Sequence, residues 1–386
     1  MVLESLKVDI SPQFRAVFVS ESIDFLSKAI FWFISSIYMN KTEYGYLSYF
    51  ISLSTFFSLI SIFGLNRLVL IKGEDNSNLF FTTIITIFFT SLLTGFLLIP
   101  INIASWVFLL SLSVQSIVIS FILANQQFQN YRNLRIVQLG TLLLFYLPLT
   151  FSMGYNGSIL SLSISNCMSL FLIFSELSEQ TERIKFDFNI YKSNLRFLVI
   201  SALLGILGSS TTAIDKLMIE ISFGIESLAE FQFSSQFLAA LNIIVVIGYS
   251  YVQPKKVKRE DTKRIERFLI WFSILCCSFM LIGYPLLIFF FFTIYSNTIL
   301  LGLFLFPNVV IRVLIMLKRA DCYAFDKVTT YLSSEILMIL IYIGGFVGTK
   351  IFISMIDISI VGLFLIAGSL SQYLFLNIKL RSQLDY

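Results

Sequence analysis

Lys and Arg residues are distributed unequally among the gaps that separate the apolar segments of this chain. We place these segments at residues 13–38, 44–63, 79–99, 104–124, 136–153, 157–175, 195–214, 228–250, 268–294, 297–317, 330–348 and 354–376, each close to the ~20 residues that cross a bilayer. The odd-numbered gaps hold only Lys41, Lys216 and Lys350, and Lys28 lies within the first segment. All other basic residues fall in the even-numbered gaps or near the two ends. This bias predicts an even number of spans with both termini in the cytoplasm.

The composition excludes several classes of protein. Hydrophobic residues make up 57% of the 386 residues and charged residues 13%, which is typical of a multi-pass membrane protein. The chain has no His, four scattered Cys and no glycine-rich phosphate-binding motif. We therefore expect no bound metal, no cofactor, no catalytic residues and no nucleotide hydrolysis. The net charge of +4 reflects loops that face anionic lipid, and no nucleic-acid partner is expected.

The chain divides into two sets of six segments. The polar stretch that follows the sixth segment predicts an N-terminal lobe at 1–180, a cytoplasmic linker at 181–194 and a C-terminal lobe at 195–386. The fold class we expect is an all-α polytopic membrane protein with twelve transmembrane helices arranged as six plus six. Two equal halves are a common plan for transporters, in which substrate binds near the middle of the membrane.

Charged residues within the apolar segments are the candidates for function, because burying a charge in a bilayer costs free energy. Glu21, Asp24 and Lys28 lie three, four and seven residues apart, which places them on one face of the first helix. They predict a polar cavity wall, with Glu21 or Asp24 able to bind a coupling H⁺ or Na⁺. The alternative is an Asp24–Lys28 ion pair that only neutralises itself.

Five further charged residues are less clearly placed by the sequence. Arg67 and Lys216 lie close to the ends of segments, where a basic side chain can extend to the membrane surface. Arg312 follows Pro307 in the tenth segment and permits the same interpretation. Asp215 ends the seventh segment, and Glu335 is a single carboxylate in the eleventh. We predict that Asp215 and Glu335 contribute cavity or ion-coupling groups.

Two stretches carry the resemblance to a known family. Glu43-Tyr44-Gly45 precedes Gly64-Leu65-Asn66 around the second segment, and IDKLMIEISFG runs from Ile214 to Gly224. Both resemble motifs of the polysaccharide or O-antigen flippases, which belong to the multidrug/oligosaccharidyl-lipid/polysaccharide exporter superfamily. The resemblance implies two six-helix lobes that alternate access across a bacterial inner membrane.

The same resemblance implies the cargo, a polyprenyl-pyrophosphate-linked oligosaccharide used for O-antigen, lipopolysaccharide or a similar surface glycan. This cargo would pass from the cytoplasmic to the outer leaflet, and other glycan-assembly membrane proteins would be partners. Its pyrophosphate requires cations, for which Lys28, Arg67, Lys216 and Arg312 are the candidates.

Two alternatives to the flippase remain open. A cation-coupled drug or metabolite antiporter of the same superfamily would use Glu21 and Asp24 to exchange H⁺ or Na⁺ for its cargo. A membrane glycan polymerase or ligase is the other alternative. That enzyme needs a sizeable outer loop, whereas the outer gaps of this chain are turns of a few residues.

Overall fold

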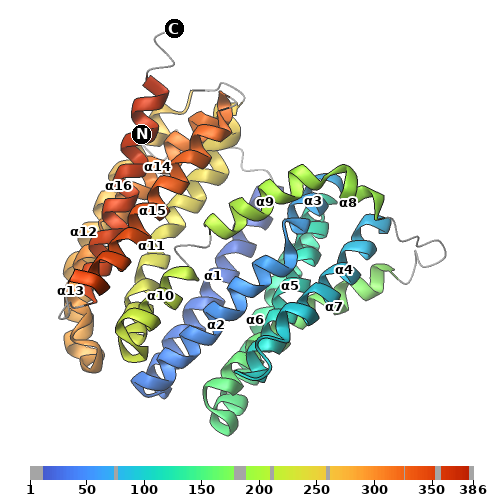
Figure 1. Cartoon of the computed structure of the whole chain (residues 1–386), viewed down its shortest axis with the longest axis horizontal. Coiled ribbons are helices and arrows are strands. Elements are labelled where there is room, and N and C mark those ends of the chain that lie inside the picture. Colours follow the sequence, from blue (N-terminus) through green and yellow to red (C-terminus); the bar gives the residue numbers. More distant parts are fainter. Residues whose placement is uncertain are drawn as a thin grey trace. The chain divides into compact units, whose positions relative to one another are not determined.

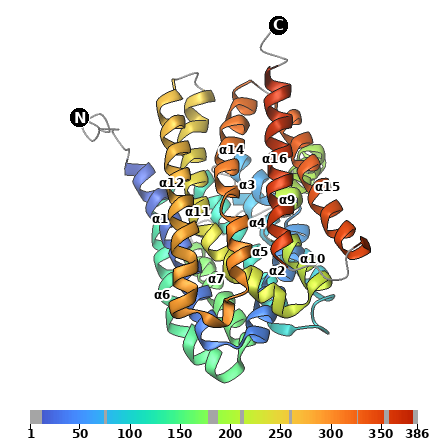
Figure 2. The same ribbon diagram turned by 90° about the vertical axis from the view of Figure 1, so that its left-hand side faces the viewer.

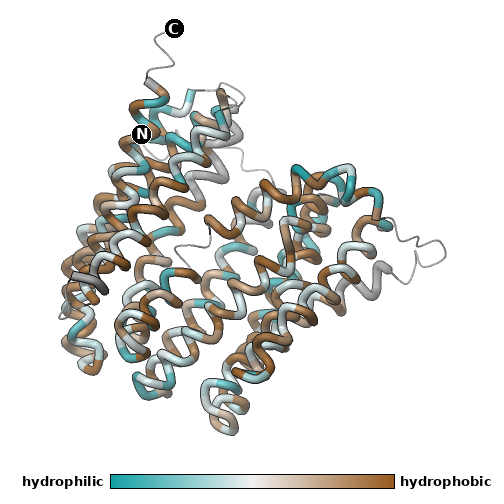
Figure 3. Tube along the Cα trace, viewed as in Figure 1, coloured by the Kyte–Doolittle hydropathy of each residue, from teal (hydrophilic) through white to brown (hydrophobic). Residues whose placement is uncertain are grey.

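The computed structural model describes residues 12–73, 77–177, 188–208, 213–257, 261–325, 327–352 and 358–381, and the secondary structure there is helical (Figure 1). The chain forms two compact units, Met1–Ile214 and Asp215–Tyr386. Hydrophobic residues recur along the long helices, while hydrophilic residues concentrate toward helix ends and connections, including α8 (Figure 3).

The first unit contains the helices that correspond to the first six predicted spans. Its described helices are α1 (Pro12–Tyr38), α2 (Lys41–Ile62), α3 (Leu65–Lys72), α4 (Ser77–Gly95), α5 (Ile103–Ala124), α6 (Phe128–Met153), α7 (Tyr155–Leu177), α8 (Asn189–Ser193) and α9 (Leu195–Gly208). Helix α5 packs against α2, α3, α4 and α7, and α6 packs against α1 and α7. The sequence did not predict α3, which lies in the gap between the second and third segments.

The second unit has α10 (Ile214–Phe223) at its start. The helices that follow are α11 (Ile225–Val257), α12 (Lys263–Phe291), α13 (Thr298–Leu305), α14 (Asn308–Ala324), α15 (Val328–Phe352) and α16 (Ser359–Arg381). Helix α14 packs against α11, α12 and α16, and α16 also packs against α13 and α15. Figure 2 shows these long helices running alongside one another.

Within the described residues, nine helical stretches are long and apolar enough to cross a membrane. They are Lys41–Ile62, Asn78–Gly95, Ile103–Ala124, Phe128–Met153, Ile225–Val246, Lys263–Phe291, Thr298–Cys322, Thr329–Gly348 and Ser359–Leu380. The predicted spans 13–38, 157–175 and 195–214 are also helical where described, but are not among the nine. The chain is therefore a multi-pass integral membrane protein.

Hydroxyl groups join neighbouring helices of the first unit. Ser54 of α2 donates a hydrogen bond to the carbonyl oxygen of Ser105 on α5, at 2.8 Å. Ser165 of α7 donates to the carbonyl oxygen of Gln138 on α6, also at 2.8 Å. Small polar side chains of this kind bring membrane helices close together, because lipid offers no competing hydrogen bonds. The Ser-rich segments thus form the interior of the unit.

The motif residues around α2 have structural roles. Asn40 and Glu43 form a capping box at the N-terminus of α2, in which each side chain accepts a hydrogen bond from the other residue's backbone N–H. Tyr44 is fully buried, with its ring 5.7 Å from that of Trp32. At the other end of α2, Gly64 adopts a left-handed φ of 76°. A Cβ there would lie 2.8 Å from the carbonyl oxygen of Leu198, so Gly64 permits close packing of α9.

The tenth predicted span corresponds to two helices, whereas the seventh, 195–214, contains α9 and ends at the first residue of α10. Residues 209–212 lie between α9 and α10 and are outside the described part of the chain. Helix α9 packs against α2 and α3 and belongs to the first unit, although it begins at residue 195. The tenth span divides at Pro307, which separates α13 from α14 because proline cannot continue the hydrogen-bonding pattern of a helix. The lobe boundaries at 180 and 195 stay predictions, and part of the linker, residues 181–187, lies outside the described residues.

Candidate functional site

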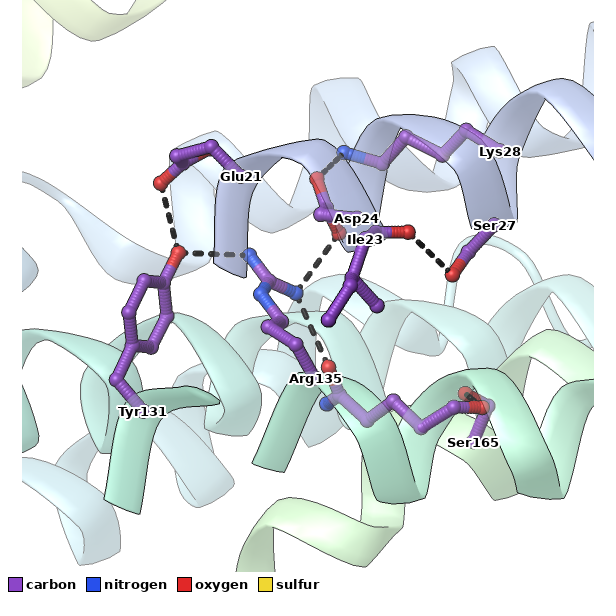
Figure 4. Close-up of polar contacts among 9 residues, drawn as sticks. Glu21, Ile23, Asp24, Ser27, Lys28, Tyr131, Arg135 and Ser165 are labelled. Atoms are coloured by element: carbon purple, nitrogen blue, oxygen red, sulfur yellow. Dashed lines mark hydrogen bonds and ion pairs between the residues drawn. The ribbon is translucent and has the colours of Figure 1, made fainter. Parts of the chain in front are cut away.

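A charged cluster joins α1 to α6 in the first unit (Figure 4). The two oxygens of the Asp24 carboxylate form ion pairs with two cations, and Lys28 also donates a hydrogen bond to it. Lys28 Nζ lies 2.6 Å from Oδ2, and Arg135 Nη1 lies 2.8 Å from Oδ1. The side chains of Asp24 and Arg135 are 17% and 11% exposed, whereas that of Lys28 is 65% exposed. Asp24 and Arg135 therefore form the inner pair, and Lys28 is the exposed partner.

Arg135 has a second set of partners on its own helix. Its Nη1 also donates to Gln138 Oε1 at 3.0 Å, and its Nη2 donates to the Tyr131 hydroxyl at 3.3 Å. Tyr131 in turn donates to Glu21 Oε1 at 2.8 Å. Two carboxylates and two cations thus form one connected network, which compensates the charges that it buries.

This network borders a cavity of about 540 Å³ within the first unit. The volume falls within the roughly 300–1,000 Å³ that holds a small molecule. Twelve of the twenty lining residues are polar, and they come from α1, α2, α3, α5, α6 and α7. They are Asp24, Ser27, Lys28, Thr55, Asn66, Gln115, Ser116, Ser120, Arg135, Gln138, Ser165 and Asn166. The charged lining residues are two cations and one carboxylate, and Glu21, which is outside the lining, supplies the second carboxylate of the network through Tyr131.

Aromatic residues form another part of the cavity wall. Phe31, Trp32 and Phe108 line it. The rings of Phe31 and Trp32 meet edge to face with centroids 5.2 Å apart, and Phe31 also contacts Tyr146 in the same way at 5.3 Å. Edge-to-face contacts of this kind stabilise packed aromatic rings. The cavity therefore has an aromatic apolar part as well as polar groups.

The structure brings together three of the predicted site residues in this unit. Glu21, Asp24 and Lys28 all belong to the network, and Asp24 and Lys28 line the cavity. The self-contained Asp24–Lys28 pair is therefore too simple a description, since Arg135 binds the same carboxylate. Arg67 lies on α3 and is not a lining residue, although its neighbour Asn66 is.

The other predicted site residues belong to the second unit. Arg312 of α14 interacts electrostatically with Asp215 of α10 and with Glu335 of α15. Asp215 is 1% exposed, and its carboxylate accepts a hydrogen bond at 2.7 Å from the backbone N–H of Lys216. Glu335 also accepts a hydrogen bond from the Tyr331 hydroxyl. A second charged group is thus formed by Arg312, Asp215, Lys216 and Glu335. Its role in transport stays a prediction.

Sequence reasoning missed Arg135 and Gln138. We placed the fifth segment at residues 136–153 and counted Arg135 with the preceding gap, but α6 begins at Phe128. A signal was present, because Tyr131, Arg135 and Gln138 have the four- and seven-residue spacing of one helical face. This stripe pairs with the equally spaced stripe of Glu21, Asp24 and Lys28. In the described residues, no group of three or more His, Cys, Asp or Glu could hold a metal ion.

Comparison with solved structures identifies the architecture. A MATE-family multidrug resistance transporter of the MOP superfamily, in an inward-facing conformation, matches with a TM-score of 0.66 at 12% identity over 95% of this chain and 98% of that chain. The chain has the MATE transporter fold. The fold has two lobes of six helices, so the expected six-plus-six architecture is confirmed.

Two further structures resemble the chain. An outward-facing MATE-family multidrug resistance transporter matches with a TM-score of 0.58 at 12% identity, over 96% of this chain and 94% of that chain. A MOP superfamily transporter from Pyrococcus furiosus, described as having a binding pocket of reverse polarity, matches with a TM-score of 0.58 at 11% identity over the same shares. No protein-family model matches the sequence, and no curated protein does either. The flippase resemblance therefore stays a prediction.

Proposed function

We propose that this chain is a cation-coupled transporter of small polar metabolites that works by alternating access. The cavity of the first unit is its binding site, and Asp24 is its coupling group. The fold supports this proposal, since solved relatives with the same fold are described in inward-facing and outward-facing conformations. The cavity volume of about 540 Å³ also suits a metabolite better than a long glycan.

The observation that carries the proposal is the position of the Asp24 carboxylate. It lies on the cavity wall, 17% exposed, between one exposed cation and one largely buried cation. When these contacts open, a carboxylate in such a place can bind H⁺ or Na⁺ and so change the charge that the cavity offers to its cargo. This is the coupling role that the sequence predicted for Glu21 or Asp24. We assign it to Asp24 because Asp24 lines the cavity.

Reconstitution into proteoliposomes tests the function. Internal pH is followed with a trapped dye while anionic, neutral and cationic metabolites are added outside. We expect at least one class to cause proton movement with the wild type, and Asp24→Asn to abolish that movement. Glu220→Gln on α10 is the control and should behave as wild type. Proton movement that Asp24→Asn leaves intact would contradict the coupling role, and absence of movement with every class would contradict the function.

A second candidate is the flippase for a polyprenyl-pyrophosphate-linked oligosaccharide in a bacterial inner membrane, with both termini cytoplasmic. The cavity lining favours it, because hydroxyl and amide groups suit a sugar and the two lining cations, Lys28 and Arg135, suit a phosphate. Its test is the sidedness of lipid-linked intermediates in cells that lack the protein. Accumulation on the cytoplasmic side, reversed by the wild type and not by Asp24→Asn/Arg135→Gln, would support it. Unchanged sidedness would exclude it.

A further inference from the structure

Two buried N–H donors of cavity-lining residues have no acceptor in the described part of the chain. They are Arg135 Nε and Gln138 Nε2. Gln138 is 6% exposed, and both residues line the cavity. A buried donor without an acceptor is costly, so such a group calls for a partner such as a water or an ion. Two donor residues on one helical face, one of them charged, suit the paired oxygens of a carboxylate, phosphate or sulfate.

The Asp24 carboxylate already contacts Arg135, which is one of the two donor residues. Its Oδ1 lies 2.8 Å from Arg135 Nη1, the same nitrogen that donates to Gln138 Oε1. The charged and titratable groups known to interact with Asp24 or its partners are Glu21 and Lys28 on α1, and Tyr131 and Arg135 on α6. The cavity-lining residues of α2, α3, α5 and α7 carry no charge. Asp24 is thus the only carboxylate in the lining that competes with an incoming anion for Arg135.

We infer that Arg135 and Gln138 form an oxyanion site, and that the anion and a proton on Asp24 bind together. An oxyanion beside Arg135 adds negative charge next to the Asp24 carboxylate and shares its cation. The carboxylate then binds a proton more tightly, and the protonated carboxyl group in turn releases Arg135 to the anion. Linkage requires this effect to be reciprocal. The inference rests on the proposed transport function and specifies its substrate class.

The direction of the linkage determines the mode of transport. A cationic cargo would compete with the proton for Asp24, and competition of that kind produces exchange. An oxyanion binds together with the proton, so the two move across the membrane in the same direction. Two cations, Lys28 and Arg135, line the cavity beside Asp24, and an anion can bind them when Asp24 is protonated, which corresponds to the second case. The site therefore points to proton–anion cotransport, in contrast to the antiport that the sequence alternative predicted.

Calorimetric titration of the purified full-length protein with inorganic sulfate tests the inference, because sulfate does not itself titrate near neutral pH. Measurements in two buffers of different ionisation enthalpy give the number of protons taken up. We expect wild type to take up protons, up to about one per sulfate as expected from linkage to a single carboxyl group. Asp24→Asn should bind sulfate more tightly with no uptake. Proton release on binding, or uptake unchanged in Asp24→Asn, would overturn the inference.

Variants of the donors make the test specific. We expect Gln138→Leu to weaken sulfate binding about tenfold, and the charge-balanced double variant Asp24→Asn/Arg135→Gln to weaken it about 10–100-fold, as for loss of charged hydrogen bonds. Arg67→Gln is the control and should bind as wild type, because Arg67 does not line the cavity. Equal binding by all three would overturn the site. An adventitious surface site would show that same result.

Further measurements distinguish the source of the anion and the cause of a failure. Competition with inorganic pyrophosphate and with polyprenyl phosphate in detergent shows whether a free anion or a lipid headgroup binds more tightly, and either result supports the site. Proton-linked sulfate binding without flux in proteoliposomes would remove the transport function and leave the site. Metabolite flux in a protein that binds none of these anions would overturn the oxyanion site and leave the function.

Discussion

Arg135 Nη1 lies 2.8 Å from Asp24 Oδ1, and this contact joins two helices that start more than a hundred residues apart in the chain. Both side chains are largely buried at the edge of the cavity. The pair therefore has two roles. It neutralises charge within the first unit, and it sets the charge that a cargo meets. The predictions that follow separate these roles from the general stability of the helices.

Removing Arg135 alone should destabilise the protein. Arg135→Ala leaves the Asp24 carboxylate with Lys28 as its only cation, and breaking a buried pair costs about 3–5 kcal/mol, less here because Asp24 is partly exposed. Thermal unfolding in detergent measures the effect. Lys28→Ala is the matched control and should change stability by no more than about 1 kcal/mol, since its side chain is 65% exposed. Equal losses in the two variants would contradict the inner-pair assignment.

Gly64→Ala should be destabilising by about 1–3 kcal/mol. The left-handed φ of 76° disfavours any side chain, and the new Cβ would lie 2.8 Å from the carbonyl oxygen of Leu198. Gly140→Ala on α6 is the control, because a Cβ there meets nothing within 4 Å. That variant should be neutral or slightly stabilising. The melting temperatures of both, measured side by side, check the close packing of α9 on α2.

Asn40→Ala should remove the cap of α2 and cost about 0.5–2 kcal/mol. The Asn40 side chain accepts a hydrogen bond at 2.8 Å from the backbone N–H of Glu43. Asn40→Ser keeps an acceptor at the same position and should retain most of the stability. If Asn40→Ser loses as much as Asn40→Ala, the capping box is not what stabilises this end of the helix.

Lys256 should stabilise one end of the second unit. Its Nζ lies 2.6 Å from Asp321 Oδ1 and 2.9 Å from Glu266 Oε1, so it joins α11, α14 and α12. The Lys256 side chain is 11% exposed. Lys256→Met leaves two carboxylates close together and should lower the free energy of unfolding by about 2–4 kcal/mol. Adding Glu266→Gln to this variant should recover part of the loss. If the second change lowers stability further, the repulsion argument is wrong.

The sequence was most informative for features that depend only on the length of the apolar segments and on the distribution of charged residues between them. Most of the twelve predicted segments match described helices to within a few residues, because a bilayer requires a minimum helix length. The sequence was less informative where contacts between helices determine the helix bounds. Helix α6 begins at Phe128, before its apolar segment. Its polar residues Tyr131 and Arg135 have partners on α1, so they lie within the helix and not in a loop. Hydropathy could not indicate those partners.

The candidate site was predicted in part for the same reason. The spacing of Glu21, Asp24 and Lys28 identified one polar face, but the residue that completes it lies on another helix. Arg67 and Arg312 were selected because they are cations near apolar residues, a criterion that does not distinguish a cavity wall from a helix end. Arg67 is not in the lining of the cavity, and Arg312 belongs to the charged group of the second unit.

Accessibility of the cavity from both sides of the membrane tests the central claim most directly. Ser116→Cys is introduced into a variant in which Cys167, Cys276, Cys277 and Cys322 are replaced, and a membrane-impermeant thiol reagent is applied to right-side-out and inverted vesicles. Leu93→Cys is the control, because Leu93 is exposed on the outside of α4 and away from the cavity lining. We predict that Ser116→Cys is labelled from both sides, with Asp24→Asn shifting the ratio, and that Leu93→Cys is labelled from neither. Labelling of Ser116→Cys from one side only, whatever the residue at position 24, would contradict alternating access through this cavity.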